Sequence, residues 1–142
     1  MSNILSTIYM AANLFAIDPV ILEGVIAVES NYCRYTKNYK STAKGCGQQL
    51  KGTAAHYGIN YEALDDNEAS IVATAYLLNR LKHKYPKKYV CAYHVGPNAA
   101  DREMDKACKE YKEMMVRRLN ENGHKLTTER LNKKIRKPKN RE

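Results

Sequence analysis

The chain has 142 residues, a length that suits one domain with a hydrophobic core of its own. Hydrophobic residues make up 44% of it, which excludes a wholly disordered protein. The formal net charge of +9 comes from 24 Lys and Arg against 15 Asp and Glu. It favours a polyanionic partner, which can be nucleic acid, an anionic membrane or an anionic cell-wall polymer.

The first half of the chain begins with two predicted helices. Apolar residues spaced by three and four predict an amphipathic helix over residues 3–15. Asp18 is suited to cap the next helix, and Pro19 fits its first position. This second helix is apolar on nearly every side until Glu29, as expected for a helix in the core. A polar loop with two glycines follows over residues 31–47.

Helical patterns continue to the end of the chain. They lie over residues 49–57, from Asp65 or Asp66 to Pro86, over 89–95 and 98–121, and from Thr127 or Thr128 to Ile135. The expected inner face of the helix over 98–121 consists of Met104, Ala107, Cys108, Tyr111, Met114 and Met115. No segment shows the two-residue period of a strand, so the sequence predicts an all-α fold.

We expect one catalytic domain over residues 1–122 and a basic extension over residues 123–142. The extension is either solvated or docked on an anionic surface. Residues 1–19 lack the features of a secretory signal, and no stretch is long enough to span a membrane. Action outside the cytoplasm would therefore require another route of delivery.

The four cysteines allow three disulfide pairings. No two of them are spaced like the ligands of a zinc site. Cys91 and Cys108 fall on helical stripes and fit small buried residues. Cys33 and Cys46 flank the 31–47 loop and could bridge it. Because no signal peptide is expected, the sequence favours reduced thiols.

Glu29 is the candidate catalytic acid. It ends the most apolar helix, where burial and the negative end of the helix dipole both disfavour the charged carboxylate. Both effects raise the pKa, and a general acid that works near neutral pH needs a raised pKa.

Three short motifs follow one another in the chain. They are Glu29-Ser30, then Gly45-Cys46-Gly47-Gln48 before Thr53-Ala54, then Ala92-Tyr93-His94 before Gly96-Pro97. Together they resemble the soluble lytic transglycosylase family over roughly residues 5–100. That family has a Glu-Ser pair, Gly-Leu-Met-Gln leading to Pro-x-Thr-Ala, and Ala-Tyr-Asn with Gly-Pro after it.

The resemblance implies a lysozyme-like α-helical fold, related to the goose-type lysozymes. It also implies cleavage of peptidoglycan between N-acetylmuramic acid and N-acetylglucosamine, with a 1,6-anhydro product and no metal or cofactor. A single acid would serve, and it would be Glu29. The other acids considered, Asp65, Asp66 and Glu68, fit helix caps better than a second catalytic carboxylate.

The resemblance also assigns substrate-binding roles to four residues. Ser30 would orient the acid, Gln48 would hold an N-acetyl group, and Tyr93 and His94 would contact the sugar. Without the resemblance, each of three residues also has an ordinary structural explanation. Ser30 could cap the next turn, Gln48 could lie in a surface turn, and Tyr93 could be a core residue. His56, His83 and His124 have no partner spacing and are expected at the surface.

Three positions depart from the family pattern. Gly47 replaces Met, which predicts a wider or more flexible cleft floor. Lys51 replaces Pro, which looks tolerable. His94 replaces Asn, which introduces a group that titrates near neutral pH.

Three alternatives remain open at this point. One is a lysozyme-type muramidase on the same fold, and another is a catalytically impaired virion protein that holds glycan or another protein. The third, a nucleic-acid-binding protein, rests on charge alone and is the least favoured. The size and charge suggest a bacteriophage protein, placed in the virion or at the host periplasm and cell wall. Virion, holin or specialised secretion would deliver it, and its basic tail would contact other virion proteins.

Overall fold

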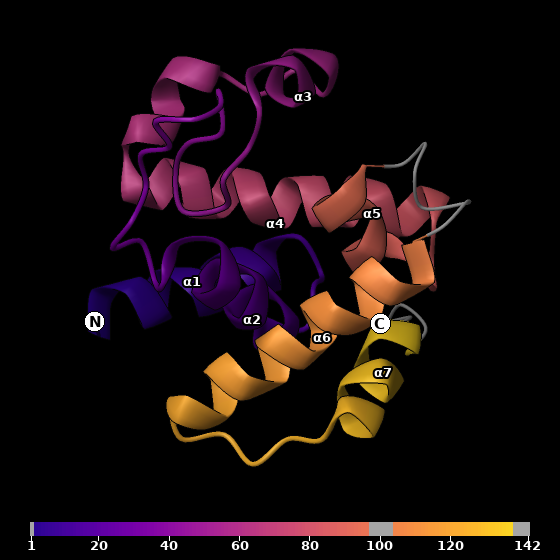
Figure 1. Ribbon diagram of the computed structural model, residues 1–142. Coiled ribbons are helices and arrows are strands. Elements are labelled where there is room, and N and C mark those ends of the chain that lie inside the picture. Colours follow the sequence, from indigo (N-terminus) through magenta and orange to yellow (C-terminus); the bar gives the residue numbers. More distant parts are fainter. Residues whose placement is uncertain (1, 97–103, 138–142) are drawn as a thin grey trace.

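The computed structural model describes residues 2–96 and 104–137 and shows a helical fold (Figure 1). The elements are α1 (Ser2–Leu14), α2 (Pro19–Ser30), α3 (Lys51–His56), the 3₁₀ helix η1 (Tyr61–Asp65), α4 (Asn67–Lys84), α5 (Tyr89–Val95), α6 (Met104–Glu121) and α7 (Thr128–Arg136). This part of the chain contains no β-strand, only two isolated bridges, one within the 31–47 loop (Lys37 to Lys44) and one from that loop to Gln49. The predicted all-α fold is confirmed. Residues 98–103 of the helix predicted over 98–121 lie outside the described residues.

Local signals set the helix boundaries. Asp18 accepts a hydrogen bond from the backbone N–H of Val20 at 2.8 Å, which caps α2 as predicted. Asp66 caps α4 through Ala69, and Thr127 caps α7. The 3₁₀ helix η1 was not predicted, because its five residues are too short to show a period.

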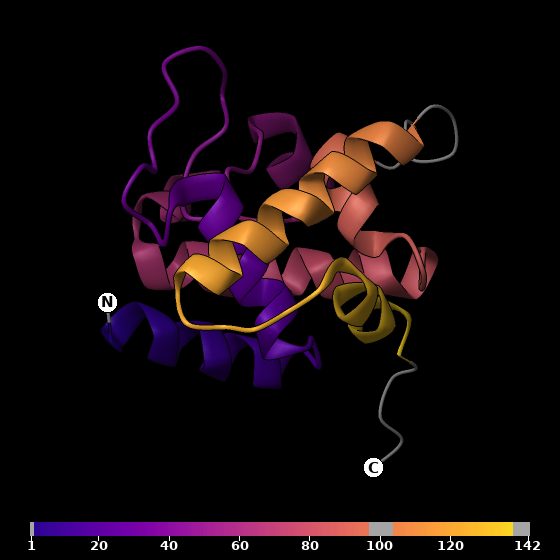
Figure 2. The same ribbon diagram turned by 60° about the horizontal axis from the view of Figure 1, so that its bottom comes forward.

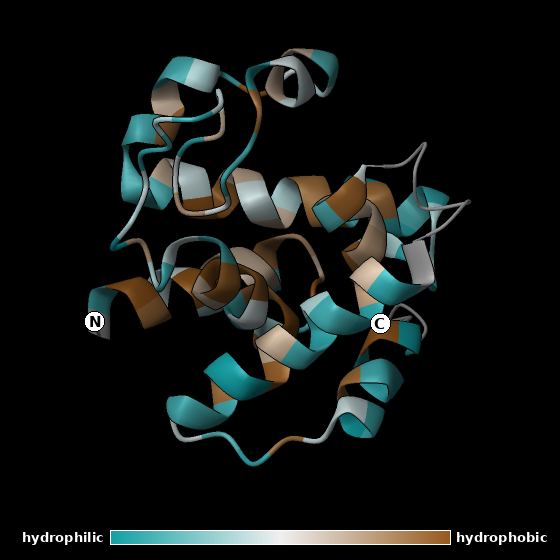
Figure 3. Ribbon diagram, viewed as in Figure 1, coloured by the Kyte–Doolittle hydropathy of each residue, from teal (hydrophilic) through white to brown (hydrophobic). Residues whose placement is uncertain are grey.

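Helix α2 is the centre of the core. It packs against α1, α4, α6 and α7, and seven consecutive residues, 21–27, are buried. Figure 3 shows the same pattern, with hydrophobic ribbon gathered on α2 and hydrophilic ribbon along the outer sides of α6 and α7. Because α2 runs through the interior, the residues at its C-terminal end are brought to the site from within the core.

The last described helix, α7, is folded onto this core. Helix α7 packs against α6 and α2, and Leu131 and Ile135 are fully buried. The 31–47 loop projects from the opposite side of the molecule (Figure 2). None of the described helices is both long enough and apolar enough to cross a bilayer.

Candidate active site

A cleft of about 510 Å³ lies between the end of α2, the loop before α3, and helices α4 and α5. Four of the five predicted site residues line it: Glu29, Gln48, Tyr93 and His94. Ser30 does not line it and is buried at the C-terminal end of α2. The folded chain therefore brings together side chains that are up to 65 positions apart in the sequence, from 29 to 94.

Glu29 lies in the last turn of α2 and faces this cleft. Burial raises the pKa of its carboxyl group to about 7, and a hydrogen bond from Tyr111 opposes that rise to a smaller extent. A carboxyl group with this pKa is about half protonated at neutral pH. It can therefore donate a proton and, once ionised, accept one.

Tyr111 is the partner of the acid, and sequence reasoning did not assign it to the site. Its hydroxyl group donates to Glu29 Oε2 at 2.8 Å from the middle of α6. Burial and the nearby Glu29 carboxylate raise the pKa of Tyr111 well above its usual value, so the phenol remains a donor. The sequence placed Tyr111 on an inner helix face, but nothing local indicated which group it would meet.

Tyr93 binds the backbone of the glycine-rich loop, Gly45-Cys46-Gly47-Gln48. Its hydroxyl group donates to the carbonyl oxygen of Gly47 at 2.6 Å. A Cβ atom at position 47 would overlap both Thr74 Oγ1 and the Tyr93 hydroxyl group. The space that a side chain would occupy at Gly47 is therefore filled by the side chains of α4 and α5.

The two adjacent glutamines differ in their surroundings. Gln48 donates through Nε2 to the carbonyl oxygens of Thr36 and Gly45, so its amide holds the loop together. Gln49 is buried, and neither amide atom has a partner of good hydrogen-bonding geometry among the described residues. The role predicted for Gln48, binding an N-acetyl group, stays a prediction.

A turn with left-handed backbone begins two residues after the acid, where α2 ends. Asn31, Tyr32 and Cys33 all have positive φ angles, of 50°, 60° and 69°. The Ser30 hydroxyl group supports this turn, because it donates to the Ile26 carbonyl oxygen and accepts from the Cys33 backbone N–H. Left-handed backbone at non-glycine residues is uncommon and often lies close to functional sites.

Two disulfides lie beside these segments. Cys33 is bonded to Cys46, and Cys91 is bonded to Cys108. The expectation of reduced thiols was wrong, because the folded chain brings the paired Cα atoms to 4.6 and 5.1 Å, within disulfide range. The bridge anticipated across the 31–47 loop is present.

The model of the transglycosylase SLT domain matches residues 6–116, which is most of the chain. The chain belongs to this transglycosylase family. No curated protein and no solved structure matches it. Family members are lytic transglycosylases that act on peptidoglycan. The matched region of this SLT domain runs from α1 into α6 and includes every residue that lines the cleft.

The structure shows the surroundings of two residues that depart from the usual transglycosylase pattern, Gly47 and His94. The predicted wider cleft floor at Gly47 is not what the packing shows, because Thr74 and Tyr93 fill that space. One part of the His94 side chain remains exposed, while its ring stacks on the ring of Tyr111 with centroids 4.2 Å apart. This partial burial lowers the pKa of His94. This histidine therefore supports the tyrosine that binds Glu29.

A second buried carboxylate lies elsewhere in this transglycosylase domain. Glu23 accepts from the Tyr32 hydroxyl group at 2.8 Å and contacts His124 Nε2 at 3.1 Å. The expected surface position of His124 was therefore wrong, although His56 and His83 are exposed as predicted. Glu23 does not line the cleft. Because Glu23 lies on α2 and His124 lies between α6 and α7, their contact links these two parts of the fold.

Proposed function

We propose that this protein is a peptidoglycan lytic transglycosylase and that Glu29 is its only catalytic carboxylate. The observation that carries the proposal is a largely buried glutamate with a pKa of about 7 in a sugar-sized cleft. Among the described residues that line the cleft, Glu29 alone is acidic. A glycosidase that uses two carboxylates would need a second carboxylate on the other side of the glycosidic bond, about 5 to 9.5 Å from the first.

The proposed reaction uses Glu29 twice. Its protonated carboxyl group transfers its proton to the glycosidic oxygen. At the same time the bond between that oxygen and the anomeric carbon of N-acetylmuramic acid breaks. The resulting carboxylate then takes the proton of the C6 hydroxyl group as O6 bonds to the anomeric carbon. A 1,6-anhydro ring forms, no water is consumed, and Glu29 is protonated again.

The neighbouring groups have supporting roles in this scheme. Tyr111 donates to Glu29 and keeps the carboxyl oriented through both proton transfers. Tyr93 holds the Gly47 carbonyl, and we propose that Gln48, Tyr93 and His94 contact the sugar from the cleft wall. Ser30 supports the turn that follows the acid.

Mass spectrometry of the muropeptides tests the reaction. Purified peptidoglycan treated with the protein should yield anhydro products, whereas a muramidase would add water and leave reducing ends. Glu29→Gln should release neither product. Wall binding by the wild type without any product would instead indicate a glycan-binding protein that has lost catalysis.

We also propose a phage setting, in which the protein is carried in the virion or released at lysis to open the host wall. The small basic domain and its two disulfides support action in an oxidising compartment such as the periplasm. A basic C-terminal extension over residues 123–142 would contact virion proteins. Detection of the chain in purified virions, or only in lysates, would test where it acts.

A further inference from the structure

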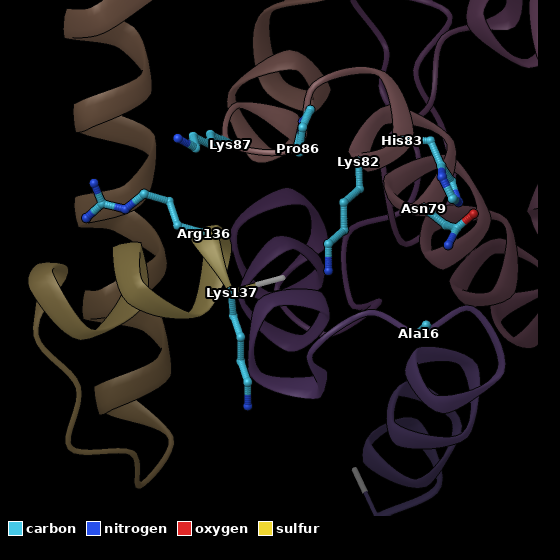
Figure 4. A pocket seen from close by; sticks show the side chains of 8 residues that line it. All are labelled: Ala16, Asn79, Lys82, His83, Pro86, Lys87, Arg136 and Lys137. Carbon is cyan, nitrogen blue, oxygen red and sulfur yellow. The ribbon is translucent and has the colours of Figure 1, made fainter. Parts of the chain in front are cut away.

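Two hollows of the molecule differ in how their polar side chains are arranged. One, of about 380 Å³, lies between the ends of α4 and α7. Figure 4 shows that Lys87 and Arg136 extend away from Lys82 there, so these side chains do not converge on one ligand group. The cleft that contains Glu29 instead includes a buried polar side chain, Gln49, whose hydrogen bonding the fold leaves incomplete.

Gln49 lies at the base of the 31–47 loop, directly after the glycine-rich loop. Its backbone N–H and carbonyl groups both pair with Lys44 at 3.1 Å, which fixes its position. The residue is only 3% exposed and lines the cleft. It belongs to none of the three motifs that resemble the transglycosylase family, so the resemblance assigns it no role.

The Gln49 amide has hydrogen-bonding capacity that the fold does not use. A glutamine amide offers two N–H groups and an oxygen with two lone pairs. Burial raises the pKa of Tyr93, and the neighbouring side chains of Thr74 and Gln49 lower it, which places the Gln49 amide close to the Tyr93 hydroxyl group. That contact is of poor geometry and accounts for at most one of the four positions. Because a buried amide with so few partners costs stability, the amide is suited to meet a ligand.

The polar side chains next to Gln49 already donate elsewhere. The hydroxyl groups of Tyr93 and Thr74 donate to backbone carbonyl oxygens at 2.6 and 2.7 Å. The Gln48 amide nitrogen donates to two more backbone carbonyl oxygens, at 3.1 and 3.0 Å. Of these four side chains, Gln49 therefore has the N–H group left to donate, and its ligand should offer an acceptor.

The lining of the cleft indicates which kind of acceptor fits. Among the described lining residues there is no lysine or arginine, so an uncharged group suits the cleft better than an anion. Apolar side chains belong to the same lining, namely Ala43, Leu50, Leu77 and Val95. A carbonyl oxygen beside a methyl group matches this mixture, and the acetamido group of an N-acetylated sugar has both.

We propose that Gln49 holds the acetamido group of one sugar of the glycan strand by donating from Nε2 to its carbonyl oxygen. The inference rests on the proposed function, which supplies an N-acetylated glycan as substrate. Rotation about the side-chain torsions of Gln49 would bring the amide to the bound group, and the acetyl methyl group would contact the apolar lining. The N-acetyl contact expected of Gln48 then belongs to Gln49, because the Gln48 amide is already bonded. A strand without acetyl groups would leave the Gln49 amide unpaired and bind more weakly.

The test compares two oligosaccharides on matched variants of the full chain. The ligands are the β-1,4-linked tetramer of N-acetylglucosamine and the same tetramer without its acetyl groups, above the pKa of the sugar amines so that both are uncharged. Gln49→Leu removes the amide and keeps the size of the side chain. Gln48→Leu is the matched control, since its amide has partners in the fold. Every chain also carries Glu29→Gln, so that calorimetric titration measures binding without cleavage.

The parent chain should bind the acetylated tetramer more tightly, and Gln49→Leu should reduce this preference about three- to tenfold, the effect of one hydrogen bond. Comparing ligand and protein changes in one cycle cancels effects that are common to both ligands. Gln48→Leu should leave the preference unchanged. The NMR signals of the Gln49 side-chain amide should shift with the acetylated tetramer alone. Equal losses for both tetramers in Gln49→Leu, or an equal drop in preference in Gln48→Leu, would overturn the proposal.

Urea denaturation separates a binding role of Gln49 from a structural one. Gln49→Leu should raise the urea midpoint, because it removes a buried and poorly bonded amide, whereas Gln48→Leu should lower it. A lower midpoint in Gln49→Leu would show that the amide supports the fold and would overturn the proposal.

The proposed reaction fails or stands by a different measurement. If anhydro products form but the preference for the acetylated tetramer does not depend on Gln49, only the role of Gln49 is wrong. If the preference depends on Gln49 but no product forms, only the reaction is wrong.

Discussion

Tyr111→Phe should shift the alkaline limit of activity upward. The hydroxyl group of Tyr111 donates to Glu29 Oε2 at 2.8 Å, and this bond lowers the pKa of Glu29 against the larger effect of burial. A hydrogen bond to a charged group contributes about 1.5–3 kcal/mol, and about 1.4 kcal/mol corresponds to one pKa unit. Loss of the bond should therefore raise the pKa of Glu29 by roughly one to two units above its present value of about 7.

The proposed reaction starts from protonated Glu29, so its rate should fall as pH rises through that pKa. Initial rates of wall clearance from about pH 5 to about pH 10 should show the falling limb one to two units higher in Tyr111→Phe. Tyr93→Phe is the matched control, because its hydroxyl group donates to the Gly47 carbonyl and not to the acid. An unmoved limb in Tyr111→Phe, or an equal shift in both variants, would refute the account of how the acid is tuned.

Three further predictions concern stability, and urea denaturation measures each. Glu29→Gln should raise the free energy of unfolding by about 3 kcal/mol above pH 7, and by little below pH 4.5. The raised pKa means that ionisation destabilises the wild-type fold between those two pH values, and an equal gain at low pH would contradict this. Gly47→Ala should destabilise by about 1–3 kcal/mol through overlap with Thr74, and adding Thr74→Ala should restore part of the loss. Cys91→Ser/Cys108→Ser should lower the free energy of unfolding by about 3 kcal/mol, and dithiothreitol should then have less effect than on the wild type.

The helical framework was predictable because its signals are local. Asp18 and Pro19 start α2, Thr127 starts α7, and apolar residues recur at helical spacing between such caps. The same reasoning placed Glu29 at the end of a buried helix, where burial raises its pKa as expected. Each inference depends on residues within a few turns of one another.

The partners of the acid depend on contacts between distant segments. Tyr111 follows Glu29 by 82 positions, so only the packing of α6 against α2 brings the two together. Glu23 was overlooked for a similar reason, since its partner His124 is 101 positions away. At Gly47 the sequence showed a missing side chain, but not that a tyrosine from α5 would fill the space.

The two disulfides join the same segments that form the site. Cys33–Cys46 connects the left-handed turn after Glu29 to the glycine-rich loop, and Cys91–Cys108 connects α5 to α6. The tyrosines from α5 and α6 bind the loop carbonyl and the acid respectively, so each covalent link lies beside one of the two hydrogen bonds. A left-handed turn of three non-glycine residues is costly and would relax if it were not held at its end. The geometry of the acid should therefore depend on oxidation even where the helices themselves do not, and reduction should lower activity before it unfolds the core.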